Sequence, residues 1–198
     1  MDAPTLLQQK IILASKSPRR AELLRAAGWP FAAVAANIDE TRYADEDAIS
    51  YVRRLAQSKA EKVAQQFPDD LVLGADTTVV IGDEILGQPG DAATAQRMLQ
   101  LLSGKWHQVL TGVALVRAAD LDVRVAHQVT RVRFAQLTQD EIDWYVNTGE
   151  PLDKAGAYGI QDRAAPFIEE IQGDYFNIVG LPMRLVYELI KKMSSANC

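Results

Sequence analysis

The sequence predicts a mixed α/β fold, a mixed sheet with flanking helices in one compact unit. Short apolar runs typical of buried strands alternate with amphipathic helical patterns, and turn signals join several strands into hairpins. No internal repeat, low-complexity tract or linker interrupts the 198 residues. This length fits one domain spanning residues 1–198, or one domain split into two lobes around a cleft.

The first half of the chain combines short apolar strands with longer helices. Gly28 marks the end of the first helix and Pro68 closes the second, while the Gly82-Asp83 pair is a hairpin signal. In chain order, we expect a strand at 11–14, a helix at 18–27, a helix at 47–66, a strand at 71–75 that ends at Asp76, and a hairpin of 77–81 with 84–86.

The second half continues the alternation. Thr138 and Glu141 form a capping box that opens a helix, and Gly149 ends it. The expected elements are a helix at 91–102, antiparallel strands at 109–117 and 122–134, the helix opening at Thr138, a hairpin of 167–171 with 175–179, and a last helix that starts near Pro182.

Composition excludes several classes of protein. The net charge of −5 and pI of about 5.1 argue against a nucleic-acid partner, which needs a broad basic face. No apolar run approaches the ~20 residues of a membrane span, and residues 1–9 lack a secretory signal. We therefore expect a cytoplasmic protein without a membrane partner. Cys198 is the single cysteine, so it forms no intramolecular disulfide, and nothing positions it as a nucleophile.

The run Ser15-Lys16-Ser17-Pro18-Arg19-Arg20 departs from the ordinary pattern of a helix start. Ser17 is a good N-cap and Pro18 a good first residue, but two arginines occupy the first turn, where acidic residues are favoured. Each cation there costs ~0.3–1 kcal/mol unless an anion binds. The run therefore indicates a phosphate site; the alternative is two solvated arginines on a surface helix.

Two further residues are candidates for chemistry. Lys59 lies within the apolar stripe of the second helix, so it either lies along apolar surface or faces a polar cleft. Arg54 lies to one side of this stripe, and we interpret it as structural. Asp76 follows a buried strand, where a carboxylate ligates a hard cation, acts as a general base, or simply caps a turn.

Other polar residues carry weaker signals. Residues 152–161 contain two glycines and a charged pair, a pattern typical of a loop that a ligand or another backbone approaches closely. His107 and His127 are far apart in sequence and have no cysteine partners, which argues against a zinc site. We interpret His107, beside Trp106, as a packed or capping residue.

Together, these segments resemble the Maf family. The Ser-x-Ser-Pro-Arg-Arg run at 15–20 matches the family's signature, and further similarities follow in order through nearly the whole chain. They are Ile38-Asp39-Glu40, Tyr51 to Ala56 with Lys59, Gly74 to Thr77, Leu102 to Gly104 with His107, Asp153 to Gln161, and Asn177 to Pro182.

The resemblance implies an activity and an architecture. It implies two lobes around an elongated cleft, a shape related to that of the inosine-triphosphate pyrophosphatases, and a homodimer. It also implies cleavage of a nucleoside triphosphate between the α and β phosphates with a divalent metal, Mg²⁺ or Mn²⁺.

The resemblance also assigns roles by position. Asp76 matches the proton acceptor and Glu40 its acidic partner near the metal, so both are expected metal ligands, and Lys59 joins them as a catalytic residue. The polar and basic residues suited to the triphosphate are Ser15, Arg20, Lys59 and Lys154. The positions that set base preference are Arg19, Thr77 and Gln161, and this combination resembles the subfamily acting on dTTP and UTP.

One position departs from the family pattern. The family usually has lysine where this chain has Gln88, so we expect weaker phosphate binding or a lower rate. The glutamine amide can still form hydrogen bonds. We therefore expect a dTTP and UTP pyrophosphatase. The alternatives are a pyrophosphatase for modified nucleotides such as 7-methyl-GTP, and a nucleotide-binding regulator of cell division and septum formation without significant turnover.

Overall fold

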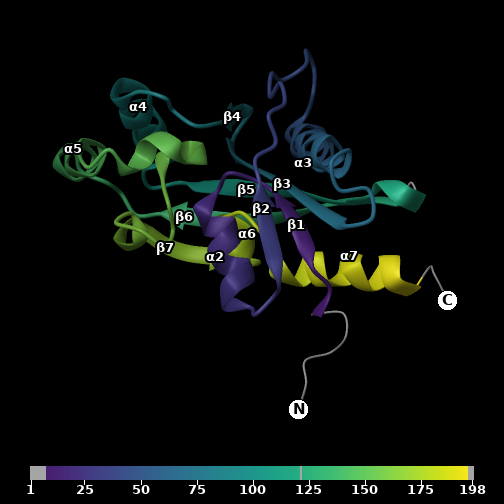
Figure 1. The fold of residues 1–198 in the computed structure, drawn as a ribbon. Helices are drawn as coiled ribbons and strands as arrows, with labels where there is room; N and C mark the ends of the chain where they lie inside the picture. Colours follow the sequence, from purple (N-terminus) through teal and green to yellow (C-terminus); the bar gives the residue numbers. More distant parts are fainter. Residues whose placement is uncertain (1–7, 121, 196–198) are drawn as a thin grey trace. The chain divides into compact units, whose positions relative to one another are not determined.

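The computed structural model describes residues 8–120 and 122–195, so Cys198 and most of the N-terminal segment lie outside the described residues. The chain divides into two compact units, and Figure 1 shows their helices and strands. The first unit comprises Met1–Asp76, Thr111–Gln128 and Gly180–Cys198. The second comprises Thr77–Leu110 and Val129–Val179.

The strands of the described chain form one seven-stranded mixed sheet, which the mixed α/β prediction anticipated. Its order is β2-β1-β3-β5-β6-β7, and β4 pairs with β3. The strands are β1 (Ile11–Ala14), β2 (Phe31–Val34), β3 (Leu71–Ile81), β4 (Glu84–Leu86), β5 (Trp106–Arg117), β6 (Asp122–Phe134) and β7 (Ile168–Gln172). The helices are α2 (Pro18–Ala26), α3 (Ala48–Ala64), α4 (Ala92–Leu102), α5 (Gln139–Asn147), α6 (Tyr175–Val179) and α7 (Met183–Ser195).

In the first unit, β1 is parallel to both of its neighbours. Ile11 lies opposite Phe31 of β2 and Leu71 of β3, and all four residues of β1 are buried. A buried strand with helices around it explains why this run is uniformly apolar rather than alternating. Helix α3 packs on the sheet through small and branched apolar residues, and the core cluster there is Ile12, Ala14, Ala56, Ala60, Val63, Ala64, Val72, Ala114 and Val116.

The second unit has its own hydrophobic core. The antiparallel β3–β4 hairpin is present as predicted, with Val80 opposite Ile85. Helix α5 begins with the predicted capping box of Thr138 and Glu141, and Gly149 follows its end in the left-handed region. Aromatic and aliphatic side chains from β5, β6, α4 and α5 fill the core, with Phe134 and Tyr145 fully buried.

One strand is missed by the sequence analysis, and two of its predictions are wrong. Strand β2 was not predicted, because Phe31-Ala32-Ala33-Val34 carries little strand signal and is fixed instead by pairing with β1. Residues 175–179 form helix α6 rather than a hairpin strand, and β7 pairs with β6. Strand β3 does not end at Asp76 but continues to Ile81, so Asp76 lies inside an 11-residue strand.

Candidate active site

The site in the first unit depends on how closely α3 approaches the sheet. A Cβ atom added to Gly74 of β3 would lie 2.1 Å from the backbone oxygen of Ala56, and one added to Gly112 of β5 would lie 2.1 Å from that of Val52. These two glycines therefore let the helix backbone rest almost directly on the strands. A side chain on the sheet-facing side of α3 then meets the strand at very short range.

Lys59, Asp76 and Glu40 come together at this contact. Asp76 lies two residues after Gly74, so it points to the same face of β3, toward α3. The Nζ atom of Lys59 lies 2.6 Å from Oδ1 of Asp76 and 3.0 Å from Oε1 of Glu40. The side chains of Lys59 and Asp76 are each 11% exposed, whereas that of Glu40 is 53% exposed. One buried ammonium thus links a buried carboxylate to a carboxylate at the surface.

Burial also sets the proton affinity of this cluster. Desolvation raises the pKa of Asp76 above the ordinary value of an aspartate, while the positive charges of Lys59 and, at longer range, Arg20 oppose this rise. A carboxylate whose basicity is increased by burial and whose position is fixed by a lysine is suited to removing a proton from water.

The place of Asp76 differs from the sequence prediction in a way that matters for ligand binding. The prediction placed it at the carboxyl end of its own strand, but β3 continues past it. Its neighbour β1 does end here, because Ala14, the last residue of β1, lies opposite Gly74. The carboxyl end of a parallel strand, where ligands collect in α/β sheets, is thus supplied by β1 and the turn after it.

That turn holds Ser15 and Arg20 in a second cluster. The hydroxyl of Ser15 accepts hydrogen bonds from the backbone N–H of Ser17, at 3.1 Å, and from Nη1 of Arg20, also at 3.1 Å. Nε of Arg20 donates to the carbonyl of Gly180 at 2.8 Å. Burial lowers the pKa of the Arg20 guanidinium, against the attraction of Asp76. Ser17 occupies the N-cap position of α2 as predicted, but its side chain makes no capping hydrogen bond.

The second unit contains the predicted residues Gln88 and Lys154. Nζ of Lys154 donates to the carbonyl of Glu150 at 2.7 Å and lies 2.9 Å from Oδ1 of Asp153 and 3.5 Å from Oδ2 of Asp162. Lys154 is buried, so its ammonium is surrounded by these oxygens. Nε2 of Gln88 donates to the carbonyl of Asp153 at 3.1 Å. The residue that departs from the family pattern is therefore bonded to the loop that carries Lys154.

Two glycines fix the course of this loop, which includes the short 3-10 helices η2 (Glu150–Asp153) and η3 (Ala155–Ala157). Gly156 adopts a φ of +67°, and a Cβ atom there would lie 2.7 Å from Val79. A Cβ atom on Gly159 would lie 2.4 Å from Oδ2 of Asp162 and 2.7 Å from the Lys154 side chain. At both glycines the atoms that approach closely are side-chain atoms of the same unit and not another backbone, and the approach of a ligand stays a prediction.

His107 is a packed residue, as its sequence context predicted. Its Nε2 atom lies 2.8 Å from the hydroxyl of Tyr158, and its ring makes an edge contact with Phe134 at a centroid distance of 5.1 Å. The side chain is 2% exposed, and burial lowers its pKa from 6.5 to about 4. Through the hydrogen bond to Tyr158, His107 connects β5 with the segment that follows the loop of Lys154.

The three residues expected to set base preference are spread along the chain. Arg19 lies half-buried in the first turn of α2, and Gln161 is exposed after the loop of Lys154. Thr77 follows Asp76 in β3, so the two side chains point to opposite faces of the strand. The roles of these residues stay predictions.

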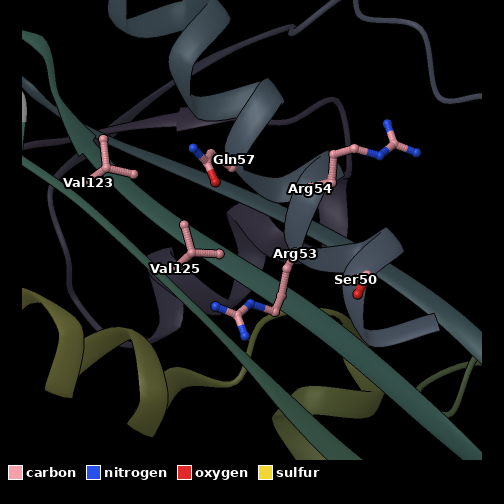
Figure 2. Close-up of a pocket in the computed structure, with 6 residues that line it drawn as sticks. All are labelled: Ser50, Arg53, Arg54, Gln57, Val123 and Val125. Carbon is pink, nitrogen blue, oxygen red and sulfur yellow. The ribbon is translucent and has the colours of Figure 1, made fainter. Parts of the chain in front are cut away.

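The first unit also has a shallow depression of about 570 Å³, shown in Figure 2. Residues of α3 and β6 line it: Ser50, Arg53, Arg54, Gln57, Val123 and Val125. None of the predicted site residues is among them, so this hollow is separate from the Lys59 cluster.

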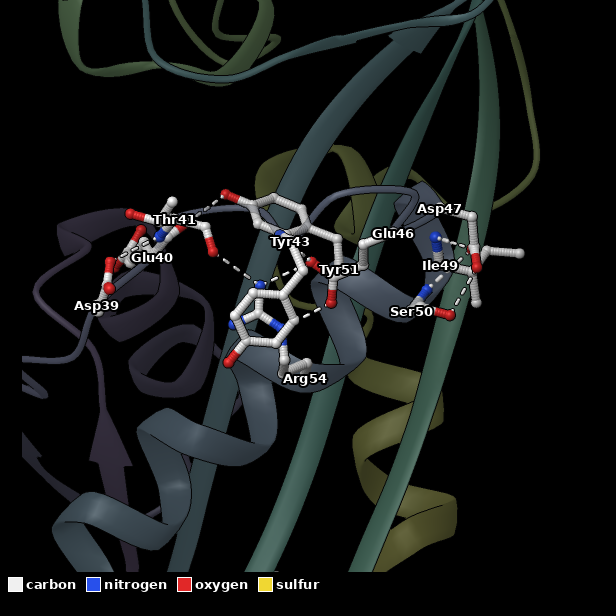
Figure 3. A network of polar contacts seen from close by, with 10 residues as sticks. All are labelled: Asp39, Glu40, Thr41, Tyr43, Glu46, Asp47, Ile49, Ser50, Tyr51 and Arg54. Atoms are coloured by element: carbon white, nitrogen blue, oxygen red, sulfur yellow. Dashed lines mark hydrogen bonds and ion pairs between the residues drawn. The ribbon is translucent and has the colours of Figure 1, made fainter.

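No role in the site is predicted for Tyr51 from sequence, and Arg54 is interpreted there as structural. The hydroxyl of Tyr51 donates to the backbone carbonyl of Glu40 at 3.0 Å (Figure 3). The signal that links them is spacing: Tyr51 and Arg54 are three residues apart on α3, so they share one face of the helix.

The donor atoms of the cluster suit a hard divalent cation. Glu40 and Asp76 are both carboxylates, and Mg²⁺ is commonly held by one or two carboxylates, with substrate phosphates and water completing its octahedron. No group of three or more His, Cys, Asp or Glu residues that could hold a metal by itself occurs in the part of the chain that the structure describes. The fit is thus to a cation that shares its coordination with a substrate.

Comparisons with known proteins find similar sequences over nearly the whole chain. A family model described as "Maf-like protein" matches residues 10–193. A protein of Symbiobacterium thermophilum named "dTTP/UTP pyrophosphatase" is 53% identical over 92% of this chain and 93% of its own length. A protein of Syntrophus aciditrophicus with the same name is 47% identical over 96% of this chain and 93% of its own.

A solved structure supports the fold alone. The Staphylococcus aureus Ham1 protein is similar in structure with a TM-score of 0.54 and 13% sequence identity, covering 93% of this chain and 100% of the Ham1 chain. Among residues 8–120 and 122–195, no helix is long and apolar enough to cross a bilayer.

Proposed function

The chain belongs to the Maf-like protein family, and we propose that it hydrolyses dTTP and UTP to the monophosphate and pyrophosphate. The names of its relatives support this substrate class. The observation that carries the chemistry is the cluster of Asp76, Lys59 and Glu40, in which a buried carboxylate of increased basicity is held by a lysine beside a second carboxylate.

Asp76 acts as the general base in this proposal. Lys59 binds its Oδ1 atom, which leaves Oδ2 for the attacking water. The water loses its proton to Asp76 as it forms a bond to the α phosphorus, and the bond from that phosphorus to the bridging oxygen breaks to release pyrophosphate. Lys59 holds Asp76 ionised and in place before the attack.

A divalent cation, Mg²⁺ or Mn²⁺, would be held by Glu40 and Asp76 and would neutralise charge on the phosphate oxygens. Glu40 is the more exposed of the two, so it can turn toward a bound cation with little cost of burial. The assignment of Asp76 to the water favours Glu40 as the main protein ligand.

Several of the basic residues would bind the triphosphate. The first turn of α2 lacks a side-chain cap, which supports binding of phosphate by its N–H groups and Arg19. Ser15 and Arg20 are hydrogen-bonded to each other in this turn. Lys154 is the further basic residue that we propose for the triphosphate. Arg19, Thr77 and Gln161 are the proposed determinants of base preference, since a glutamine amide can pair with the donor–acceptor edge of uracil or thymine.

We also propose, on the family resemblance, that the protein acts in the cytoplasm as a homodimer. Sedimentation of the purified chain over a range of concentrations tests the dimer. A constant monomer mass would contradict it.

Pyrophosphate release from a panel of nucleoside triphosphates tests the function. With Mg²⁺ or Mn²⁺, release should be strongest for dTTP and UTP, and EDTA should abolish it. Asp76→Asn should lower kcat by about 10²–10⁴-fold while the thermal unfolding transition remains cooperative. Asp83→Asn, which removes an exposed carboxylate at the β3–β4 turn, is the matched control and should keep full activity.

The outcomes separate the alternatives. Release only from 7-methyl-GTP or another modified nucleotide would retain the enzyme class and refute the substrate assignment. Tight binding of dTTP without release would support a nucleotide-binding regulator. An Asp76→Asn variant with nearly normal kcat would remove the general base from the mechanism.

A further inference from the structure

Glu40 belongs to a long connection without regular secondary structure. Residues 35–47 join β2 to α3, and most of them are exposed. The Glu40 side chain itself is 53% exposed, yet its carboxylate lies 3.0 Å from the buried ammonium of Lys59. An exposed segment of this length has many accessible conformations, so some other contact must hold it against α3.

Arg54 supplies the strongest of these contacts. Its Nε and Nη2 atoms bind the two oxygens of Glu46 at 2.6 and 2.7 Å, and Nη2 also donates to the carbonyl of Thr41 at 3.1 Å. The guanidinium lies over the ring of Tyr43 at 4.0 Å from its centroid. One side chain of α3 thus binds three residues of the connection, and the bidentate geometry fixes direction as well as distance.

Tyr51 adds a contact to Glu40 itself. Its hydroxyl donates to the Glu40 carbonyl at 3.0 Å, and its ring lies 5.7 Å from the Arg54 guanidinium (Figure 3). Arg54 and Tyr51 therefore hold the connection on both sides of Thr41.

We propose that Arg54 and Tyr51 are positioning residues for the reaction, because they hold the 39–46 segment so that the Glu40 carboxylate stays beside Lys59 and Asp76. This inference rests on the proposed function. The two residues touch no reacting atom in it. Their effect passes through Glu40, and that gives the inference a specific test.

The test is a double-mutant cycle with Glu40. Arg54→Met removes the guanidinium but keeps most of the apolar stem, and Tyr51→Phe removes only the hydroxyl. Arg53→Met is the matched control, because Arg53 is an exposed arginine on the same helix that forms no hydrogen bond or ion pair with the 39–46 segment in the described structure. Each variant is made alone and with Glu40→Gln, and kcat and KM for dTTP are measured.

We expect Arg54→Met to lower kcat by on the order of 10- to 100-fold, the usual result of a small displacement of a catalytic group. In the Glu40→Gln background, Arg54→Met should lower kcat by less than about twofold. Both residues act through the Glu40 carboxylate, and Glu40→Gln has already removed it. Tyr51→Phe should show the same pattern with a smaller loss, and Arg53→Met should change neither value. Equal losses in both backgrounds would overturn the proposal.

Amide hydrogen exchange of residues 39–46 gives a readout that does not need turnover. Exchange there should accelerate in Arg54→Met and Tyr51→Phe, and remain as in the wild type in Arg53→Met. Unchanged exchange in Arg54→Met would show that Arg54 does not hold the 39–46 segment, and it would refute the proposal even if activity fell. If exchange accelerates in the variants but the wild type releases no pyrophosphate from any nucleotide, the two residues do hold the 39–46 segment and the proposed function is refuted.

Discussion

The buried His107 should make the free energy of unfolding decrease as the pH falls below neutrality. Replacing His107 by a residue that does not titrate should remove this contribution. Burial lowers the pKa of His107 from 6.5 to about 4. Between these values, the unfolded chain binds a proton on this residue and the folded chain does not. Stability from the neutral His107 is therefore fully present above pH 6.5 and is lost as the pH falls toward 4.

The magnitude follows from the same two values. A shift of this size corresponds to about 3 kcal/mol of differential protonation energy in total. Integrated between pH 7 and pH 5, the loss is about 2 kcal/mol, a large part of the stability of an ordinary domain.

His107→Gln isolates this contribution. Glutamine does not titrate, and its amide can still meet the hydroxyl of Tyr158, although the edge contact with Phe134 is lost. Urea unfolding of the wild type and the variant at pH 8, where His107 is neutral in both states, gives the packing cost alone. At pH 5 the stability deficit of the variant should shrink by about 2 kcal/mol or reverse. A deficit that stays the same at pH 8 and pH 5 would refute the reasoning.

Three further predictions concern the site and its support. Lys59→Met should destabilise the protein by about 3–5 kcal/mol, because it leaves a buried carboxylate unpaired, and Lys59→Met with Asp76→Asn should recover most of this loss in urea unfolding. Gly74→Ala should cost about 3 kcal/mol or more, since its Cβ atom would lie 2.1 Å from a backbone oxygen of α3. Gly87→Ala, which meets nothing within 4 Å, is the control and should unfold like the wild type. Gln88→Lys should raise kcat/KM for dTTP roughly tenfold, about 1.4 kcal/mol, and an unchanged kcat/KM at low and high salt would argue against a phosphate contact at this position.

Local patterns account for most of the elements. The capping box at Thr138, the hairpin at Gly82 and the apolar stripe of α3 each depend on residues close in sequence, and each is present in the structure. Two places were open for Lys59, along apolar surface or toward polar groups, and the structure shows ion pairs with Asp76 and Glu40; its role in catalysis stays a prediction.

Predictions failed where distant residues decide the conformation. Residues 175–179 have strand-forming side chains, but the buried amide of Asn177 donates to the carbonyl of Val109 at 2.9 Å and to Oγ1 of Thr130 at 3.0 Å. Asp174 also accepts a hydrogen bond from the backbone of Phe176 at 2.8 Å. These bonds favour the helical turn over the strand. The bonds of Asn177 reach residues distant in sequence, so no local propensity encodes them, whereas the turn at Asp174 is a local signal that the strand prediction missed.

The sequence by itself determined the fold class, the family and the kinds of side chain available for phosphate and metal chemistry, because these depend on composition, periodicity and short motifs. Only the tertiary structure decided that Lys59 pairs with both Asp76 and Glu40, and that Arg54 binds Glu46 in the segment carrying Glu40. Those contacts require α3 to lie against β3 at the distance that Gly74 and Gly112 allow. Such a distance is a property of packed backbones, and it exists only once both elements are in place.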